Sequence, residues 1–435
     1  MSLNATHNPA LRSWVASANA AGCDFPIQNL PFGVFSHGGS APHGGIAIGD
    51  QVLCLRHALH AGVFIGLAAA AAEAACEPTL NKLMAMGNLP ASALRAQVSA
   101  LLAEGATPRP ELLVPMTEAT MHAPSAPGAF TDFLTSIHHM WRGIKSRDPN
   151  GQLPPGFKHL PIAYNSRASS LVASPQPFIR PNGIRQNADG SVVFGPTMSQ
   201  DFELELGFFV GAGNRLGQPI NIEAAEDHIF GLCLLNDWST RDVQRFESAP
   251  LGPFLGKSAM TSVSPWVITL EALAPFRIPG PVRPEGDPAP LAHFVGAKDQ
   301  AAGGLDLHME VLFQTPTMRA GNQAPARVVN TNFQHMYWTL AQMLTHHASN
   351  GCNLRPGDVM ASGTCSGPTD DSRACMSEIT RGKDPITLPN GETRLWLEDG
   401  DEVIFRARAE KPGHVGIGFG ECRGVVLPAV AWPAA

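Results

Sequence analysis

The chain has 435 residues and a formal net charge of −7, and 44% of its residues are hydrophobic. This length predicts two domains, and the acidic balance excludes a basic surface for nucleic acid. No apolar run reaches the ~20 residues of a membrane helix, no signal-peptide pattern begins the chain, and the eight cysteines form no CxxC pair, so we expect a cytoplasmic protein with reduced thiols.

The first part of the chain, residues 1–118, is predicted to form a separate domain. Between residues 25 and 56, short apolar runs alternate with glycine pairs, a pattern typical of the strands of a small barrel. Helices are expected over residues 67–76, which are rich in alanine, and over residues 92–104, where a serine can cap the start and a glycine the end. The prolines that follow indicate a linker.

The second part, residues 119–435, mostly shows a pattern of strand, turn and strand with many glycines and prolines. One clear helix is predicted over residues 333–349, because apolar residues recur there at helical spacing. Thr331 or Asn332 can cap its start, and Gly351 its end. These elements predict a mainly β protein with some α-helix.

Four acidic residues lie within apolar stretches of the second part: Asp132, Glu203, Glu205 and Asp237. Glu203 and Glu205 alternate with leucines in the strand period, so both carboxylates point to one face of a strand. Because isolated buried carboxylates are costly and repel each other, a bound cation explains them well. All-oxygen ligation favours Mg²⁺, Ca²⁺ or Mn²⁺ over zinc. The alternative is a half-exposed strand whose acidic face is solvated.

Longer runs of the second part form a recognisable series, with NDWSTRD at 236–242, PLGPFLGKS at 250–258, and further runs at 159–170, 335–339, 345–347 and 350–364. In this order they resemble the fumarylacetoacetate hydrolase family, strongly from about Thr131 onward and weakly in the first third, at residues 24–33. The resemblance implies a small N-terminal SH3-like barrel domain over 1–118, a larger C-terminal β-sandwich roll of the family type over 119–435, and a homodimer.

The resemblance also implies a reaction. Enzymes of this family hydrolyse the carbon–carbon bond of 4-fumarylacetoacetate to fumarate and acetoacetate, the last step of tyrosine and phenylalanine breakdown. The leaving carbanion must be stabilised as an enolate, which a divalent cation can do as a Lewis acid. Two alternatives stay open: a hydrolase or decarboxylase of another acylpyruvate-like β-diketone acid, and a catalytically silent, metal-binding dimeric scaffold. The separate N-terminal domain favours hydrolysis of 4-fumarylacetoacetate over the reactions of other β-diketone acids.

By the same resemblance, His139 is the general base and Glu378 its partner, in a relay that activates water. The cation, Mg²⁺ or Ca²⁺ or else Mn²⁺, would be held by the four acids. Lys257 and Thr261 would lie beside Asp237 at this metal site.

Substrate contacts and oxyanion stabilisation are expected from Lys257, Gln244, Thr364 and Arg147, with Arg142 as the alternative to Arg147. Leu134 and Ser248 depart from the family, which commonly places tyrosines at these positions against the substrate. Each missing phenol could cost about 1 kcal/mol of substrate-binding free energy if its hydrogen-bond partner were left buried and unpaired. The pocket would then suit a less polar or differently shaped diketone.

Two adjacent histidines, His346 and His347, lie near the end of the predicted helix. Histidine is common at a helix C-terminus, where it interacts favourably with the helix dipole. No carboxylate motif accompanies this pair. We therefore expect neither of them to bind a metal.

Overall fold

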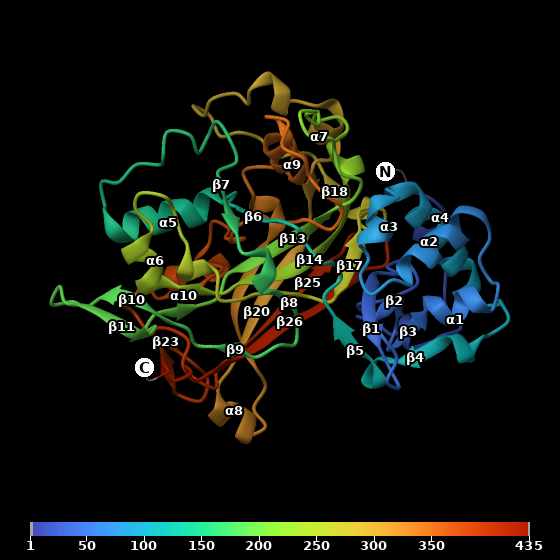
Figure 1. Cartoon of the computed structure of the whole chain (residues 1–435), viewed down its shortest axis with the longest axis horizontal. Helices are drawn as coiled ribbons and strands as arrows, with labels where there is room; N and C mark the ends of the chain where they lie inside the picture. The colour runs from blue at the N-terminus through green and yellow to red at the C-terminus, as the bar shows by residue number, and fades with distance from the viewer. Residues whose placement is uncertain (1–2, 434–435) are drawn as a thin grey trace.

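The computed structural model describes residues 3–433 and has a mixed fold dominated by strands (Figure 1). The largest sheet has 13 strands, ordered β4-β3-β2-β1-β17-β14-β13-β22-β6-β7, with β5, β8 and β16 off this path. This arrangement confirms the predicted mainly β fold with some helix. The strands of this sheet are β1 (Phe32–Ser36), β2 (His43–Ile48), β3 (Gln51–Cys54), β4 (Leu113–Pro115), β5 (Thr120–His122), β6 (Phe130–Phe133), β7 (Ala163–Ser166), β8 (Leu171–Ala173), β13 (Leu204–Val210), β14 (Ile229–Asp237), β16 (Thr261–Val263), β17 (Trp266–Thr269) and β22 (Val359–Ala361).

A second sheet has five strands, ordered β21-β20-β25-β26-β9. Its strands are β21 (Ala326–Asn332), β20 (His308–Gln314), β25 (Glu402–Ala409), β26 (Ile417–Leu427) and β9 (Phe178–Ile179). Four two-stranded ribbons complete the strand pairing of the described residues. They are β10 (Asn182–Gln186) with β11 (Val192–Pro196), β12 (Gln200–Asp201) with β15 (Ser239–Thr240), β18 (Arg277–Ile278) with β19 (Gly304–Leu305), and β23 (Ile386–Thr387) with β24 (Thr393–Arg394).

The central strands of the large sheet pack against the five-stranded sheet through one face. On β13, Leu204, Leu206 and Phe208 belong to the hydrophobic cluster that also contains side chains of β25 and β26. Phe209 belongs instead to the cluster under the N-terminal helices. Because side chains alternate along a strand, Glu205 lies on the face of β13 opposite the leucines, as the sequence predicted.

The N-terminal unit consists of the antiparallel run β1 to β4, with β5 on β1 and four helices between β3 and β4. Figure 1 shows these elements in blue to teal. Gly44 on β2 lets the alanine-rich helix α2 (Gly66–Ala75) approach closely, because a Cβ at this position would clash with the carbonyl oxygen of Ala75. Strand β1 also pairs with β17, so this unit shares the large sheet with the rest of the chain. The SH3-like barrel stays a prediction, since no pairing among residues 3–433 closes these strands into a barrel.

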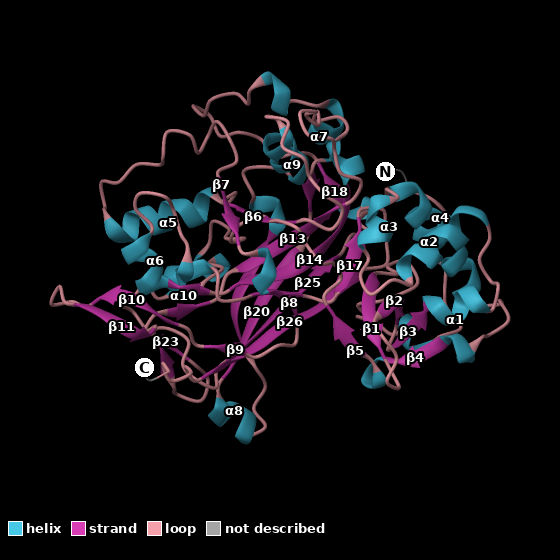
Figure 2. Ribbon diagram, viewed as in Figure 1, coloured by secondary structure: helices cyan, strands magenta, loops and turns pink. Residues whose placement is uncertain are grey.

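Most helices are short, and α2 lies on one face of the large sheet, against Gly44 of β2 (Figure 2). The predicted alanine-rich helix is confirmed as α2, and the helix expected over 92–104 is present but begins at Asn88. The α-helices are α1 (Leu55–His60), α2, α3 (Asn81–Ala85), α4 (Asn88–Leu102), α5 (Ile137–Arg147), α6 (Arg241–Glu247), α7 (Ala297–Ala302), α8 (Pro316–Ala320), α9 (Leu340–Ala348) and α10 (Met376–Ile379).

The single helix predicted over 333–349 is wrong. A 3₁₀ turn at Phe333–His335 is followed by a non-helical segment that bends at Tyr337 and Trp338, and α9 begins only at Leu340. Its start is fixed by a capping box, in which the Thr339 hydroxyl accepts from the Gln342 backbone and the Gln342 side chain accepts from the Thr339 backbone. Asn332 caps only the 3₁₀ turn. Tyr337 and Trp338 instead pack with Phe157 and Phe294 in a separate apolar cluster.

Among residues 3–433, no helix combines the length and the apolar character that a membrane crossing requires.

Candidate active site

Three of the four predicted metal-binding acids converge on one face of the large sheet. Asp132 is on β6, Glu205 on β13 and Asp237 at the end of β14, and these strands lie close together in the sheet order. Each side chain offers a carboxylate oxygen, and the three oxygens lie within 4.8 Å of one another. All three residues are buried, Glu205 and Asp237 completely. The acids are therefore not the solvated face of a half-exposed strand.

Each acid of this cluster has one oxygen without a hydrogen-bond donor: Oδ1 of Asp132, Oε1 of Glu205 and Oδ1 of Asp237. The other oxygens are occupied. The Tyr164 hydroxyl lies 2.8 Å from Oδ2 of Asp132 and 2.9 Å from Oδ2 of Asp237, and the backbone N–H of Gly363 donates to Oε2 of Glu205 at 3.1 Å. Three orphaned, buried carboxylate oxygens within one group of converging side chains fit a hard divalent cation. We name these three residues the acid cluster.

The electrostatics of the acid cluster agree with this fit. Burial raises the pKa of Asp132 and of Glu205 well above the ordinary range, and neighbouring carboxylates raise both further. Burial also raises the pKa of Asp237, against the opposing charge of Lys257. Burial thus favours the protonated forms of these acids, whereas a nearby double positive charge favours their ionised forms.

Glu203, the fourth predicted ligand, is paired with cations of the protein. Nη2 of Arg241 donates to its Oε1 at 2.7 Å, and Nζ of Lys257 pairs with its Oε2. Burial by itself would raise the pKa of Glu203, but Arg241 and Lys257 together lower it below the ordinary range. Lys257 also lies 2.5 Å from Oδ2 of Asp237, so it joins Glu203 to the acid cluster.

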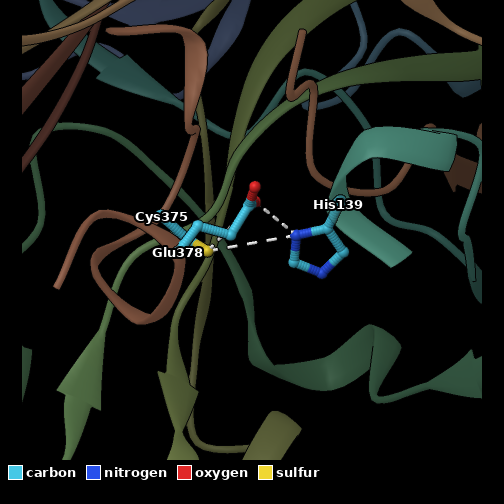
Figure 3. A group of neighbouring side chains, drawn as sticks. All are labelled: His139, Cys375 and Glu378. Atoms are coloured by element: carbon cyan, nitrogen blue, oxygen red, sulfur yellow. Dashed lines mark hydrogen bonds and ion pairs between the residues drawn. The ribbon is translucent and has the colours of Figure 1, made fainter. Parts of the chain in front are cut away.

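His139 lies next to Glu203, in the first turn of α5. The Ser136 side chain caps the start of this helix. Nδ1 of His139 is 2.6 Å from Oε1 of Glu378 on α10 (Figure 3). Its Nε2 is 3.8 Å from Oε1 of Glu203. Burial opposes the charge of Glu378, but His139, together with hydrogen bonds that include one from Arg142, lowers its pKa to about 2. Because Glu378 is anionic, Nδ1 of His139 donates to it and Nε2 is left as a proton acceptor.

The neighbouring histidine, His138, is directed elsewhere. Its ring packs edge-on against His335, with 6.4 Å between the ring centroids. Burial and then Arg142 lower the pKa of His138. Of the two adjacent histidines, only His139 forms a hydrogen bond with Glu378 in the described structure.

Several predicted substrate-site residues surround this arrangement. Oε1 of Gln244 on α6 accepts from Nη1 of Arg241 at 3.1 Å. Thr261 is the cross-strand partner of Asp237 and is buried. Thr364, also buried, follows the Gly363 whose N–H binds the acid cluster.

The remaining predicted residues lie further out. Ser248 is the C-cap of α6, and its hydroxyl donates to the Gln244 carbonyl. Leu134 packs on the apolar cluster of Phe157 and Tyr337. Arg147 is exposed at the end of α5, and its Nε donates to the carbonyl oxygen of Gly143. Nη1 of Arg142, by contrast, donates to Oε2 of Glu378 at 3.0 Å. The structure thus brings Arg142, and not Arg147, to the histidine.

Sequence reasoning missed two residues of the site. Asp201 is completely buried and accepts from Nε of Arg241 at 2.8 Å and from the backbone of Ser377 at 3.0 Å. It precedes Glu203 by two residues, so the strand alternation that identified the glutamates could have extended to it. Tyr164 is one of only two tyrosines in the chain, and its position within an otherwise polar strand gave no further signal.

Comparisons with known proteins agree over nearly the whole chain. Residues 133–427 match the model of the fumarylacetoacetate (FAA) hydrolase C-terminal family, and residues 28–124 match that of the fumarylacetoacetase N-terminal family. The fumarylacetoacetase of Homo sapiens is 44% identical over 419 residues, which cover 94% of this chain and 97% of the relative. That of Arabidopsis thaliana is 42% identical over 415 residues, which cover 93% and 96%.

A solved structure described as an HpcE protein from Mycobacterium smegmatis is similar in fold. It has a TM-score of 0.50 and 17% sequence identity, and the match covers 91% of this chain and 99% of that one. At this identity the likeness concerns the fold alone.

Proposed function

Because the chain belongs to the fumarylacetoacetate hydrolase family and is a hydrolase, we propose that it cleaves the carbon–carbon bond of 4-fumarylacetoacetate to fumarate and acetoacetate. The observation that carries this proposal is the orientation of His139, whose Nδ1 is held by Glu378 while its Nε2 faces Glu203, beside the acid cluster. A general base directed at a metal site is what hydrolysis of a chelating diketone requires.

The acid cluster would hold Mg²⁺ or Ca²⁺, or else Mn²⁺, through its three orphaned oxygens. Such a cation supplies Lewis acidity for the diketone oxygens. Lys257 and Arg241 offset the negative charge of Glu203 next to it, and the Tyr164 hydroxyl fixes the positions of Asp132 and Asp237.

The reaction then follows from the residues of the chain. Nε2 of His139 accepts a proton from water, and the water oxygen bonds to the ketone carbon next to the double bond. The bond from that carbon to the neighbouring methylene breaks, and its electron pair stays on the methylene as an enolate. The proton held by His139 returns to this carbon, which completes acetoacetate. Glu378 stays ionised throughout and stabilises the imidazolium that forms.

The test is the loss of absorbance of the enol form of fumarylacetoacetate, followed with and without EDTA. We expect turnover that EDTA abolishes and that Mg²⁺ or Ca²⁺ restores. Turnover that is unchanged after complete removal of divalent cations would contradict the metal dependence. Absence of turnover in the cation-loaded protein would favour the scaffold alternative.

The remaining proposals depend on family resemblance. We propose that the reaction ends tyrosine and phenylalanine breakdown, in the cytoplasm, in a homodimer. We also propose domains at 1–118 and 119–435, which the separate family matches at 28–124 and 133–427 support.

A different β-diketone acid is the second candidate substrate, and it is favoured by Leu134 and Ser248, where the family commonly has tyrosines. Leu134→Tyr and Ser248→Tyr are expected to change KM or substrate preference more than metal binding. A new phenol that finds a partner strengthens binding by roughly 0.5–1.5 kcal/mol. KM for fumarylacetoacetate and for simple acylpyruvates measures this effect. Unchanged KM and kcat for every substrate would place both positions outside the pocket.

Glu378→Gln is expected to lower kcat by about 10- to 100-fold, less than loss of the base itself, since a neutral amide orients His139 but weakens its basicity. The folded-state pKa of Glu378 is depressed to about 2. Its stabilising contribution is therefore present above the ordinary carboxyl pKa and is lost as the pH falls toward 2. Thermal unfolding between pH 5 and 2 should lose less stability in Glu378→Gln than in the wild type. Equal losses of stability in the variant and the wild type would show that the charge of Glu378 does not stabilise the folded protein.

A further inference from the structure

A second set of metal-ligand atoms lies on the Nδ1 side of the His139 ring. Sγ of Cys375, the residue before α10, is 4.0 Å from Nδ1 of His139 and 3.5 Å from Oε1 of Glu378 (Figure 3). With the 2.6 Å between Nδ1 and Oε1, all three atoms lie within 4.8 Å of one another. Cys375 has no part in the hydrolysis proposed above, so the presence of a thiol at this point needs its own account.

We propose that His139, Cys375 and Glu378 form a binding site for a borderline-soft divalent cation of the Zn²⁺ type, and that its occupation switches off the general base. Imidazole nitrogen, thiolate sulfur and carboxylate oxygen are the donors that zinc prefers, whereas the all-oxygen acid cluster suits harder cations. The two metal sites of the chain therefore differ in chemistry.

The distances fit a four-coordinate ion. Bonds of about 2.3 Å to sulfur and about 2.0 Å to nitrogen and oxygen place tetrahedral ligand atoms about 3.3–3.6 Å apart. The separations from Sγ, 3.5 Å to Glu378 and 4.0 Å to His139, are close to these values. The nitrogen and oxygen must separate by about 0.7 Å as the cation replaces the proton that they share, and Nδ1 must approach Sγ by about 0.5 Å.

The surroundings also suit a cation. Burial raises the pKa of the Cys375 thiol well above its ordinary value, and the anions Asp201 and Glu378 raise it further, so the thiol is held protonated and inert until a metal displaces the proton. Oγ of Ser377 lies 3.3 Å from Sγ and can donate to the thiolate. The His139 side chain is 16% exposed, so the group is not wholly enclosed, and a fourth ligand of the cation would be water.

Arg142 and Arg241 are the positive charges that oppose binding. Nη1 of Arg142 donates to Oε2 of Glu378, whereas Oε1 accepts from His139 and from the Ser366 hydroxyl, which would share this oxygen with the metal. Arg241 is itself paired with Asp201 and Glu203, which offset its charge. With one thiolate and one carboxylate, a divalent cation forms an electrically neutral group, which a buried position requires.

Binding changes the position of the imidazole proton. In the metal-free site Nδ1 of His139 donates to Glu378, and Nε2 can accept a proton from water. A cation on Nδ1 requires that nitrogen to be unprotonated, so the imidazole carries its proton on Nε2. The thiol proton leaves to solvent, one for each cation bound. His139 can then no longer act as a base. Inhibition thus depends on the proposed function, whereas metal binding does not.

Co²⁺ titration of the full chain saturated with Mg²⁺ tests the binding. We expect the near-ultraviolet charge-transfer band of a cobalt thiolate, in the wild type and in the control Cys352→Ser, which removes a half-buried thiol elsewhere. The band should be lost in Cys375→Ser and in Cys375→Ala. A wild-type titration without this band, which needs no variant, would overturn the proposal, as would a band that both Cys375 variants retain.

Zn²⁺ titration of the Mg²⁺-loaded hydrolase tests the consequence. We expect inhibition of the wild type and of Cys352→Ser, whereas Cys375→Ser keeps its basal activity and needs about 100-fold more Zn²⁺, since even outer-shell changes cost 10–100-fold in affinity. Inhibition at the same Zn²⁺ concentration in Cys375→Ser would overturn the switch. If the chain proved inactive on fumarylacetoacetate, the cobalt band would still decide whether the site exists.

Discussion

Replacing His139 with alanine is expected to lower kcat by about 10²- to 10⁴-fold, the usual contribution of a positioned general base. The fold should survive, because His139 lies in the first turn of α5 and is half-buried at the surface of the site. The bound cation should also survive, since the acid cluster lies on β6, β13 and β14 and not on α5. A steady-state assay on fumarylacetoacetate, combined with elemental analysis of the purified variant, measures both quantities.

His138→Ala is the matched control, because it removes the same side chain one residue away. His138 contacts His335 edge-on and has no carboxylate partner among the residues that the structure describes, so its loss should change kcat little. An inactive His138→Ala together with an active His139→Ala would reverse the assignment of the base. Metal-free protein from His139→Ala would instead make this histidine a structural support of the acid cluster.

The strand alternation of β13 is the part of the site that the sequence predicts best. Apolar residues and acids alternate along this strand, so all the apolar side chains must lie on one face of the sheet and all the acids on the other. The leucines accordingly pack against the second sheet, and Glu205 lies on the opposite face. The same pattern continues to Asp201 on β12. Local periodicity therefore identifies which side chains share a face.

Periodicity does not identify partners. Glu203 and Glu205 are equivalent in the alternation, yet Glu203 is paired with Arg241 and Lys257 while Glu205 keeps an orphaned oxygen. Glu378 reaches His139 from 239 residues away, so only the tertiary fold, or family resemblance, can pair them. That these two residues form a pair was expected from the resemblance, and their geometry supports the expected roles.

The arginine on α5 shows the same limit. Arg142 is three residues from His139, on the adjacent turn of the helix. Arg147 is eight residues from His139 and therefore about 12 Å from it along the helix axis. Without knowing that a helix runs over 137–147, the two arginines cannot be distinguished. The error over 333–349 has a related cause. Apolar residues at helical spacing also fit a bent, non-helical segment, in which Phe333 and Met336 pack in the main core and Tyr337 packs in a separate cluster.

Removing an acid of the cluster is expected to abolish cation binding and activity together. Asp132→Ala takes away one of three converging ligands and leaves the Tyr164 hydroxyl with Asp237 alone. Elemental analysis should find no stoichiometric Mg²⁺ or Ca²⁺, and turnover should fall to the level of the EDTA-treated wild type. The control is Asp384→Ala, which removes one negative charge from an exposed loop. Stoichiometric metal at wild-type affinity in Asp132→Ala would show that Asp132 is not a ligand.

Thermal unfolding gives a second measure of the same site that does not depend on the reaction. A cation that binds only the folded protein stabilises it by about 2.7 kcal/mol at a concentration of 100 Kd, so saturating Mg²⁺ or Ca²⁺ should raise the Tm of the wild type and of Asp384→Ala. Asp132→Ala should lose this increase. Glu203→Ala should lose most of it for a different reason: it leaves Lys257 with Asp237 as its remaining carboxylate partner, which places an unbalanced positive charge beside the cation. Restoration of the increase by Glu203→Ala combined with Lys257→Met would separate this charge effect from direct ligation, because the double variant removes both charges and keeps the acid cluster.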